Sequence, residues 1–206
     1  MPVPLVLASA SPARLSTLRA AGIEPRVIVS DVDEDAILAG LEDASVSEAA
    51  LVLARAKAEA VAALTEADGS LVIGCDSILE VDGEAFGKPG TADVARERWR
   101  RMRGREGALH TGHWLVDARA AERPAAGETA STTVRFADLT DDEIDAYVAT
   151  REPLAVAGGF TVDGLGGPFV ESIDGDYHAV VGLSLPLLRH LAARLGVGVT
   201  ELWTRR

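Results

Sequence analysis

Residues 4–14 read PLVLASASPAR and contain the clearest indication of the fold. Their apolar half, Pro4 to Ala8, is typical of a short buried strand. Ser11 has the side chain of a helix N-cap, and Pro12 suits the first helical position. Gly22 predicts the end of that helix, because glycine readily takes the left-handed conformation found after a last turn. We therefore expect a strand that leads directly into a helix.

Strands and helices alternate along the rest of the chain. Further strands are expected at 27–29, 71–74, 78–81, 109–117, 129–136 and 169–173, and helices at 45–64, 92–102, 140–149 and 184–196. Asp82-Gly83 predicts a hairpin turn, and residues 119–127 a loop. Because strands and helices are interleaved, we expect an α/β fold with a mixed sheet. No repeat or linker divides the chain, which predicts a single domain over residues 1–206.

The composition narrows the class of protein. The net charge is −12, and no long basic run is present, so a nucleic-acid partner is not expected. No apolar run approaches the roughly 18 residues of a membrane span, and the first residues lack a positive leader, so no membrane partner is expected either. Cys75 is the only cysteine, which excludes an intrachain disulfide and suits a reducing compartment. We therefore expect a cytoplasmic protein.

Positive charge is distributed unusually. The chain has 18 arginines but only two lysines, Lys57 in a predicted helix and Lys88 in a Gly-Lys-Pro loop. Lysine presents a compact charge that suits a single phosphate oxygen, whereas arginine presents a planar fork. Two lysines and a metal ion would supply the charge neutralisation that phosphoryl transfer needs. The alternative is that the two lysines are retained by chance.

The predicted turn between the first strand and helix is a candidate anion site. Free backbone N–H groups and the positive end of the helix dipole point at a ligand there. Ser9 and Ser11 add hydroxyl groups, and Arg14 lies on the first turn. The alternative is a plain capped helix with a surface arginine.

Acidic residues offer two further candidates. A predicted loop contains Asp31, Asp33, Glu34 and Asp35, whose carboxylates are suitable ligands for Mg²⁺ or Mn²⁺. Asp76 follows an apolar strand, where α/β sheets usually bind ligands, and could hold a metal or orient a water. The alternatives are a solvated loop and a turn cap. Cys75 is expected to be a buried apolar residue, and the four histidines form no metal-binding pattern.

Several short sequence segments, taken in their order along the chain, match the motifs of a known protein family. They are Leu7–Arg14, Val32–Glu34, Ala54–Ala58, Gly74–Ser77, Gly87–Pro89, Ala157–Phe160 with Asp163–Gly167, and Ile173–Tyr177 with Val180–Leu183. In this order they resemble the Maf family of nucleotide pyrophosphatases, which share a fold with the inosine triphosphatases. The resemblance spans nearly the whole chain. It implies a twisted mixed sheet flanked by helices, in two lobes around a central cleft.

The resemblance also implies an activity. Water attacks the α-phosphorus of a nucleoside triphosphate, and pyrophosphate leaves. Ser9, Ser11 and Arg14 would hold the triphosphate. Glu34 and Asp76 would hold a divalent metal ion (Mg²⁺, Mn²⁺ or Co²⁺), with Asp76 as the proton acceptor. Lys57 and Lys88 would neutralise the phosphates. Family members commonly form homodimers and are linked to arrest of cell division and to removal of non-canonical nucleotides.

The chain departs from the family pattern at Ala13, Ser77, Val156 and Asp163, where Arg, Thr, Lys and Gln are usual. By resemblance, Ala13, Ser77 and Asp163 influence which base is accepted. Two alternatives to the pyrophosphatase remain. One is a nucleotide-binding regulator of cell division with little catalysis, motivated by Ala13 and Val156. The other is a different phosphatase that uses Asp31-Val32-Asp33 as a nucleophile motif.

Overall fold

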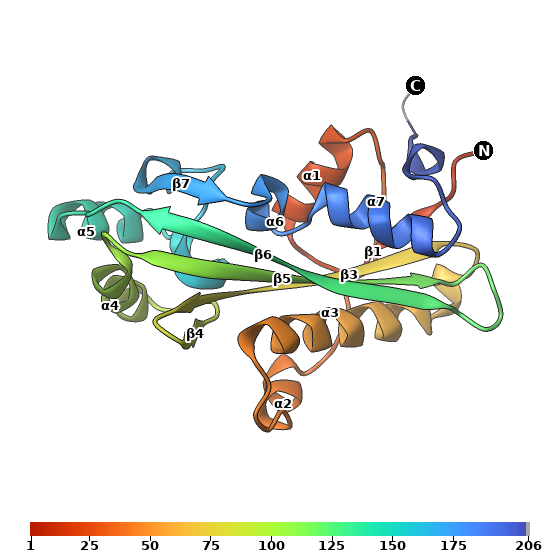
Figure 1. The fold of residues 1–206 in the computed structure, drawn as a ribbon, viewed down its shortest axis with the longest axis horizontal. Coiled ribbons are helices and arrows are strands. Elements are labelled where there is room, and N and C mark those ends of the chain that lie inside the picture. The colour runs from red at the N-terminus through yellow and green to blue at the C-terminus, as the bar shows by residue number, and fades with distance from the viewer. Residues whose placement is uncertain (205–206) are drawn as a thin grey trace.

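A computed structural model of the chain describes residues 1–204. Within these residues, seven strands form one mixed sheet with helices on both faces (Figure 1), which confirms the α/β class. The strands are β1 (Leu5–Leu7), β2 (Arg26–Val27), β3 (Leu71–Val81), β4 (Glu84–Phe86), β5 (Glu106–Asp117), β6 (Ala125–Phe136) and β7 (Val170–Asp174).

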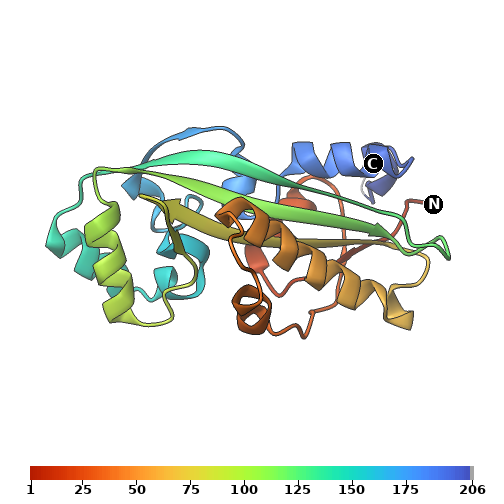
Figure 2. The same ribbon diagram turned by 60° about the horizontal axis from the view of Figure 1, so that its bottom comes forward.

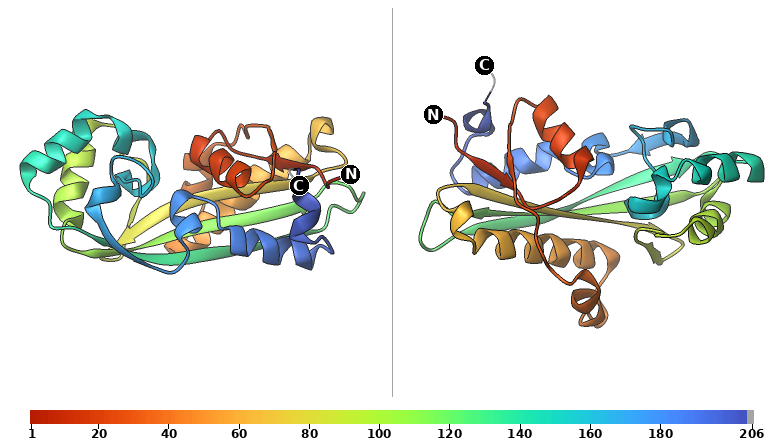
Figure 3. Two further views of the ribbon diagram at one scale, coloured as in Figure 1. Left: turned by 90° about the horizontal axis from the view of Figure 1, so that it is seen from above. Right: turned by 180° about the vertical axis from the view of Figure 1, so that it is seen from behind.

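Helices flank this sheet. They are α1 (Pro12–Ala20), α2 (Glu34–Ala39), α3 (Val46–Ala62), α4 (Ala92–Met102), α5 (Asp141–Ala149), α6 (Tyr177–Val181) and α7 (Leu185–Arg194), with 3₁₀ turns at Thr65–Ala67, Glu152–Ala155, Ala157–Gly159, Gly167–Phe169 and Val199–Leu202. Figure 3 shows α1, α6 and α7 on one face of the sheet, and α2 and α3 on the other. No helix in the described part of the chain is long and apolar enough to cross a membrane.

The strand-to-helix turn near the start forms as the sequence predicts. β1 is completely buried, and the Ser11 hydroxyl accepts a hydrogen bond from the Arg14 N–H at the start of α1. Gly22 follows the last turn with a φ of 80°, a left-handed conformation that suits glycine. The first turn of α1 therefore lies at the carboxyl end of a buried strand.

β3 differs from the prediction. The sequence suggested two strands, 71–74 and 78–81, with Asp76 beyond the end of the first, but β3 is continuous from Leu71 to Val81. The reason is that β5 pairs with β3 over residues 71–80 and supplies hydrogen bonds throughout. The polar pair Asp76-Ser77 therefore lies in mid-strand and does not interrupt it.

The other edge of β3 is interrupted. β1 runs parallel to β3 and pairs with residues 71–73, whereas β4 pairs antiparallel with residues 79–81. Because β5 occupies the opposite edge, β1 and β4 share this one, and in the described chain no strand pairs with residues 74–78 between them. We call this segment of edge the β3 gap. Asp76 and Ser77 lie at its centre.

Helix α3 runs along β3 and β5 (Figure 2) and packs closely on them because glycine occupies two facing positions. A Cβ atom would lie 2.3 Å from the Ala54 carbonyl oxygen if built at Gly74, and 2.3 Å from the Ala50 carbonyl oxygen if built at Gly112. Any larger side chain would push the helix away. Gly112 is the register partner of Asp76, so the close approach occurs beside that carboxylate.

Two more predictions need correction. The acidic stretch is not all loop, because Asp33 caps α2 by accepting a hydrogen bond from the Ala36 N–H (2.9 Å), and Glu34 and Asp35 begin the helix. The predicted loop at 119–127 is shorter, because the β5–β6 hairpin pairs as far as Val116 and Ala125. The two-lobed shape with a central cleft stays a prediction.

Candidate active site

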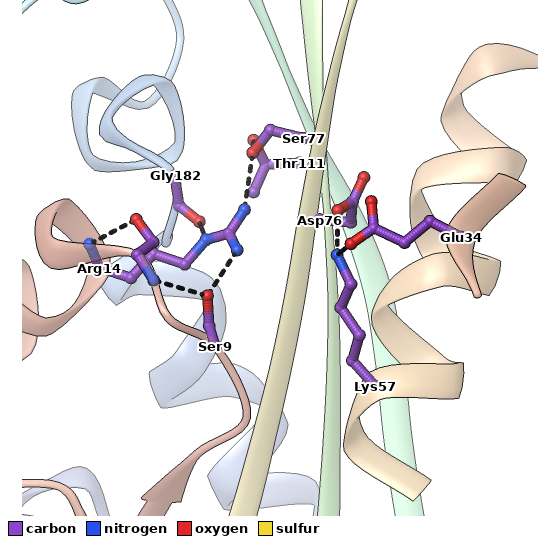
Figure 4. Close-up of polar contacts among 9 residues, drawn as sticks. Ser9, Arg14, Glu34, Lys57, Asp76, Ser77, Thr111 and Gly182 are labelled. Carbon is purple, nitrogen blue, oxygen red and sulfur yellow. Dashed lines mark hydrogen bonds and ion pairs between the residues drawn. The ribbon is translucent and has the colours of Figure 1, made fainter. Parts of the chain in front are cut away.

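Three charged side chains from three elements meet on the α3 side of the β3 gap (Figure 4). The Lys57 ammonium lies 2.5 Å from Asp76 Oδ1 and 2.9 Å from Glu34 Oε1. Lys57 and Asp76 are 6% and 8% exposed, whereas Glu34 is partly open to solvent. Burial tends to raise the pKa of Glu34, but the hydrogen bond and charge of Lys57, with the charges of Lys88 and Arg14, lower it overall. The cluster is a buried cation held between two carboxylates.

Arg14 lies on the other side of β3 in a different environment. Its Nε donates to the Gly182 carbonyl (2.8 Å), and its Nη1 and Nη2 donate to the hydroxyls of Ser9 (3.0 Å) and Ser77 (3.4 Å). All three acceptors are neutral, and among residues 1–204 no carboxylate forms an ion pair with Arg14, whereas arginines such as Arg119 pair with an acid. A fixed guanidinium that forms no ion pair within these residues suits an anionic ligand.

The two groups lie on opposite faces of β3 at the β3 gap. Successive side chains on a strand point to opposite faces, so Asp76 points towards α3 and Ser77 towards α1 and α6 (Figure 4). Within the described residues no strand pairs with this edge of β3 between the two groups. Lys88 follows β4, on the far side of the gap, and is exposed. Its positive charge contributes to the lowered pKa of Glu34.

The remaining predicted residues take different positions. The Ser11 hydroxyl is engaged as the cap of α1, whereas Ser9 accepts from both the Ser11 N–H (3.2 Å) and Arg14. Ala13 and Asp163 line one cavity of about 290 Å³ between α1 and α6, together with Tyr177 and His178. Ser77 is not among its lining residues. Val156 precedes the 3₁₀ turn at Ala157–Gly159 and does not line this cavity.

The glycine-rich segment that carries Asp163 is held by Glu152. This carboxylate accepts hydrogen bonds from the Tyr147 hydroxyl (3.1 Å), the Thr161 hydroxyl (2.5 Å) and the backbone N–H groups of Leu165 and Gly166 (both 3.1 Å). Burial acts to raise the pKa of Glu152, but these hydrogen bonds lower it overall. An ionised Glu152 therefore shapes the segment beside the cavity.

Two buried residues of β5, Thr111 and His113, connect the sheet to α6 and to the start of α7. The buried Thr111 hydroxyl donates to the Ala179 carbonyl (2.9 Å) and lies 3.0 Å from Ser77 Oγ. His113 is completely buried, with Nδ1 2.9 Å from the Thr111 carbonyl oxygen and Nε2 accepting from the Ser184 N–H (2.8 Å). These contacts place the imidazole proton on Nδ1. His113 is thus a packed, neutral histidine of the core.

His113 is expected to make stability pH-dependent. Burial lowers its pKa from 6.5 to about 4, with a smaller lowering by Arg14 and opposing effects of the Thr111 carbonyl and Asp176. As the pH falls, the unfolded chain therefore takes up the proton first. The stabilisation is complete above pH 6.5 and is lost towards pH 4, and at pH 5 the loss is about 2 kcal/mol.

Urea denaturation of the wild type and His113→Gln at pH 8 and pH 5 measures this contribution. The glutamine variant is less stable at pH 8 but has the shallower pH dependence. Equal slopes in the two proteins would show that His113 is not the titrating group.

Cys75 is fully buried, and burial raises the pKa of its thiol to about 12. A thiol held in its neutral form is a poor nucleophile, which agrees with the prediction of a buried apolar residue. Within residues 1–204, no group of three or more His, Cys, Asp or Glu side chains gathers as a ready metal site. The two carboxylates Glu34 and Asp76 converge on the Lys57 ammonium.

The fold and the site together define an α/β protein in which two carboxylates and a buried lysine lie across one strand from an arginine that has no ion-pair partner among residues 1–204. Comparison with known proteins agrees. The family model described as Maf-like protein matches residues 4–195, and the chain belongs to the Maf family.

Relatives with more than half of their residues identical to this chain share one name. A Streptomyces avermitilis protein named nucleoside triphosphate pyrophosphatase is 57% identical over 98% of this chain and 95% of its own length. Proteins of the same name from Streptomyces coelicolor and Salinispora tropica are each 58% identical, over 97% and 100% of this chain and 94% and 89% of their own lengths.

Proposed function

We propose that the chain hydrolyses a nucleoside triphosphate to a nucleoside monophosphate and pyrophosphate. The carrying observation is the arrangement at the β3 gap. There Lys57, held between Asp76 and Glu34, lies across one strand from Arg14, which forms no ion pair among residues 1–204. Such a site supplies an acceptor for a proton and fixed positive charge for an oligophosphate. The name shared by the relatives supports this assignment.

Each polar group has a role in this proposal. Asp76 accepts the proton of the attacking water, and Lys57 holds that carboxylate in place and neutralises phosphate charge. Ser9 and Arg14 bind phosphate oxygens at the start of α1, where the helix dipole also favours an anion. Lys88 approaches the same phosphates from the far side of the gap.

We also propose that Glu34 and Asp76 bind a divalent metal ion beside the Lys57 ammonium. The two carboxylates fit this role, because both already reach a single point, the Lys57 ammonium. Magnesium ions are commonly held by one or two carboxylates together with substrate phosphates, so a fuller protein cage is not required. When bound, the ion neutralises negative charge on the phosphate oxygens.

A panel of canonical and modified nucleoside triphosphates, each supplied with Mg²⁺, Mn²⁺ or Co²⁺, tests the function. Pyrophosphate and monophosphate are the expected products, and omission of the metal is expected to abolish their release. Orthophosphate as the only product would instead favour the phosphatase that uses Asp31 and Asp33. Triphosphate binding without product release across the panel would favour the regulator of cell division.

Assembly and location belong to the same proposal. We propose a homodimer in the cytoplasm, supported by the family resemblance and by a single, buried cysteine that suits a reducing compartment. Light scattering of the purified chain distinguishes a dimer from a monomer.

A further inference from the structure

Thr111 occupies a central position behind the proposed phosphate site. It is completely buried on β5 and is the register partner of Ser77 on β3. Its hydroxyl proton is donated to the Ala179 carbonyl in α6. Thr111 has only one such proton, so in the 3.0 Å contact with Ser77 it must be the acceptor.

This assignment fixes the direction of the hydrogen bonds made by the Ser77 and Thr111 hydroxyls. Ser77 donates to Thr111, so the Ser77 oxygen presents a lone pair to the Nη2 of Arg14. On the other side, the Ala179 carbonyl that Thr111 holds also accepts from the Gly182 N–H (3.1 Å). The Gly182 carbonyl in turn accepts from Arg14 Nε. Both sides of the guanidinium are therefore connected to one buried hydroxyl.

We propose that Thr111 is a positioning residue for substrate binding, because it fixes the plane of the Arg14 guanidinium through Ser77 and through the end of α6. This inference rests on the proposed function, since it assigns Arg14 to the phosphates. Thr111 itself contacts no substrate. Its loss leaves the charge of Arg14 in place but removes the oriented acceptors that hold it.

The test compares valine and serine at position 111. Thr111→Val keeps the shape but removes the hydroxyl, and KM for the triphosphate is expected to rise about tenfold, with kcat changed less than about twofold. Thr111→Ser keeps the hydroxyl and is expected to restore the wild-type KM. Thr129→Val is the matched control, because it removes another bond from the sheet to a helix, to the Ser47 carbonyl of α3 (3.0 Å), away from Arg14.

A double-mutant cycle separates positioning from a general structural effect. In an Arg14→Gln background, Thr111→Val is expected to have no further effect on KM. An unchanged KM in folded Thr111→Val, a serine variant as impaired as the valine variant, or additive effects with Arg14→Gln would each overturn the proposal. If Thr111→Val does not fold, Ser77→Ala interrupts the same chain of hydroxyls and is expected to raise KM similarly.

The positioning role of Thr111 can be tested even if the proposed pyrophosphatase activity is refuted. A wild type that releases no pyrophosphate from any triphosphate refutes the activity, but calorimetric binding of inorganic triphosphate still measures the positioning. The dissociation constant is then expected to rise about tenfold in Thr111→Val and to return in Thr111→Ser. Equal constants for all three proteins would refute the role of Thr111 as well.

Discussion

Replacement of Asp76 by asparagine is expected to lower the rate of pyrophosphate release at least about a hundredfold, because a positioned general base typically contributes that much or more. The amide oxygen can still accept the Lys57 hydrogen bond, so the fold is kept, but an amide cannot take a proton from water. Initial rates of pyrophosphate release, with thermal denaturation as the check on folding, measure the effect.

Asp31→Asn is the matched control for this experiment. Asp31 is an exposed carboxylate that precedes α2, and its loss is expected to leave the rate unchanged. Full activity of Asp76→Asn would refute the assignment of the base. Loss of activity in Asp31→Asn, together with release of orthophosphate, would favour the phosphatase alternative.

Replacement of Lys57 by methionine is expected to abolish activity and to destabilise the protein by about 3–5 kcal/mol, as is typical when one partner of a buried ion pair is removed. Methionine matches the aliphatic part of the lysine side chain and can occupy the same buried position on α3, but Asp76 and Glu34 then face each other without a cation. Urea denaturation measures the free energy of unfolding, and rates of pyrophosphate release measure activity.

The other lysine provides the comparison. Lys88 is exposed, so Lys88→Met is expected to change the free energy of unfolding by less than about 0.5 kcal/mol while raising KM. Mg²⁺ is expected to stabilise Lys57→Met more than the wild type, because the two carboxylates no longer have an internal cation. A Lys57→Met protein as stable as the wild type and indifferent to Mg²⁺ would contradict both the buried pair and the proposed metal site.

The two predictions differ in what they test. Asp76→Asn preserves the hydrogen bond and removes one protonation state, so it isolates the chemical step. Lys57→Met removes the group on which both carboxylates converge, so it affects stability, metal binding and catalysis together. The contrast between Lys57 and Lys88 is possible because these are the only lysines of the chain.

Several features could be predicted from the sequence because they depend on local chemistry. The cap at Ser11 and the left-handed Gly22 follow from short-range geometry, and both are present. The interleaved order of strands and helices indicated the α/β class. The scarcity of lysine in the composition indicates Lys57 as a candidate site residue. The acidic stretch reads as a loop in the sequence, because a helix of six residues has almost no periodic signal.

The positions of the site residues depended on pairing between distant strands. β3 passes through Asp76 without a break because β5 supports it from the other edge, and this partner lies more than 30 residues away in the sequence. The gap between β1 and β4 is likewise a consequence of how short those two strands are. Neither fact can be read from the residues around Asp76.

The sequence by itself determined which chemical groups are present: two lysines, a Ser-rich turn before a helix, and acidic side chains at Glu34 and Asp76. Only the tertiary structure decided that Glu34, Lys57 and Asp76 share one point, and that Arg14 is held by the Gly182 carbonyl and by hydroxyls that lead to Thr111. The physical reason is that backbone carbonyls are identical in every residue. Which of them faces a guanidinium is set by long-range packing, and local sequence does not encode it.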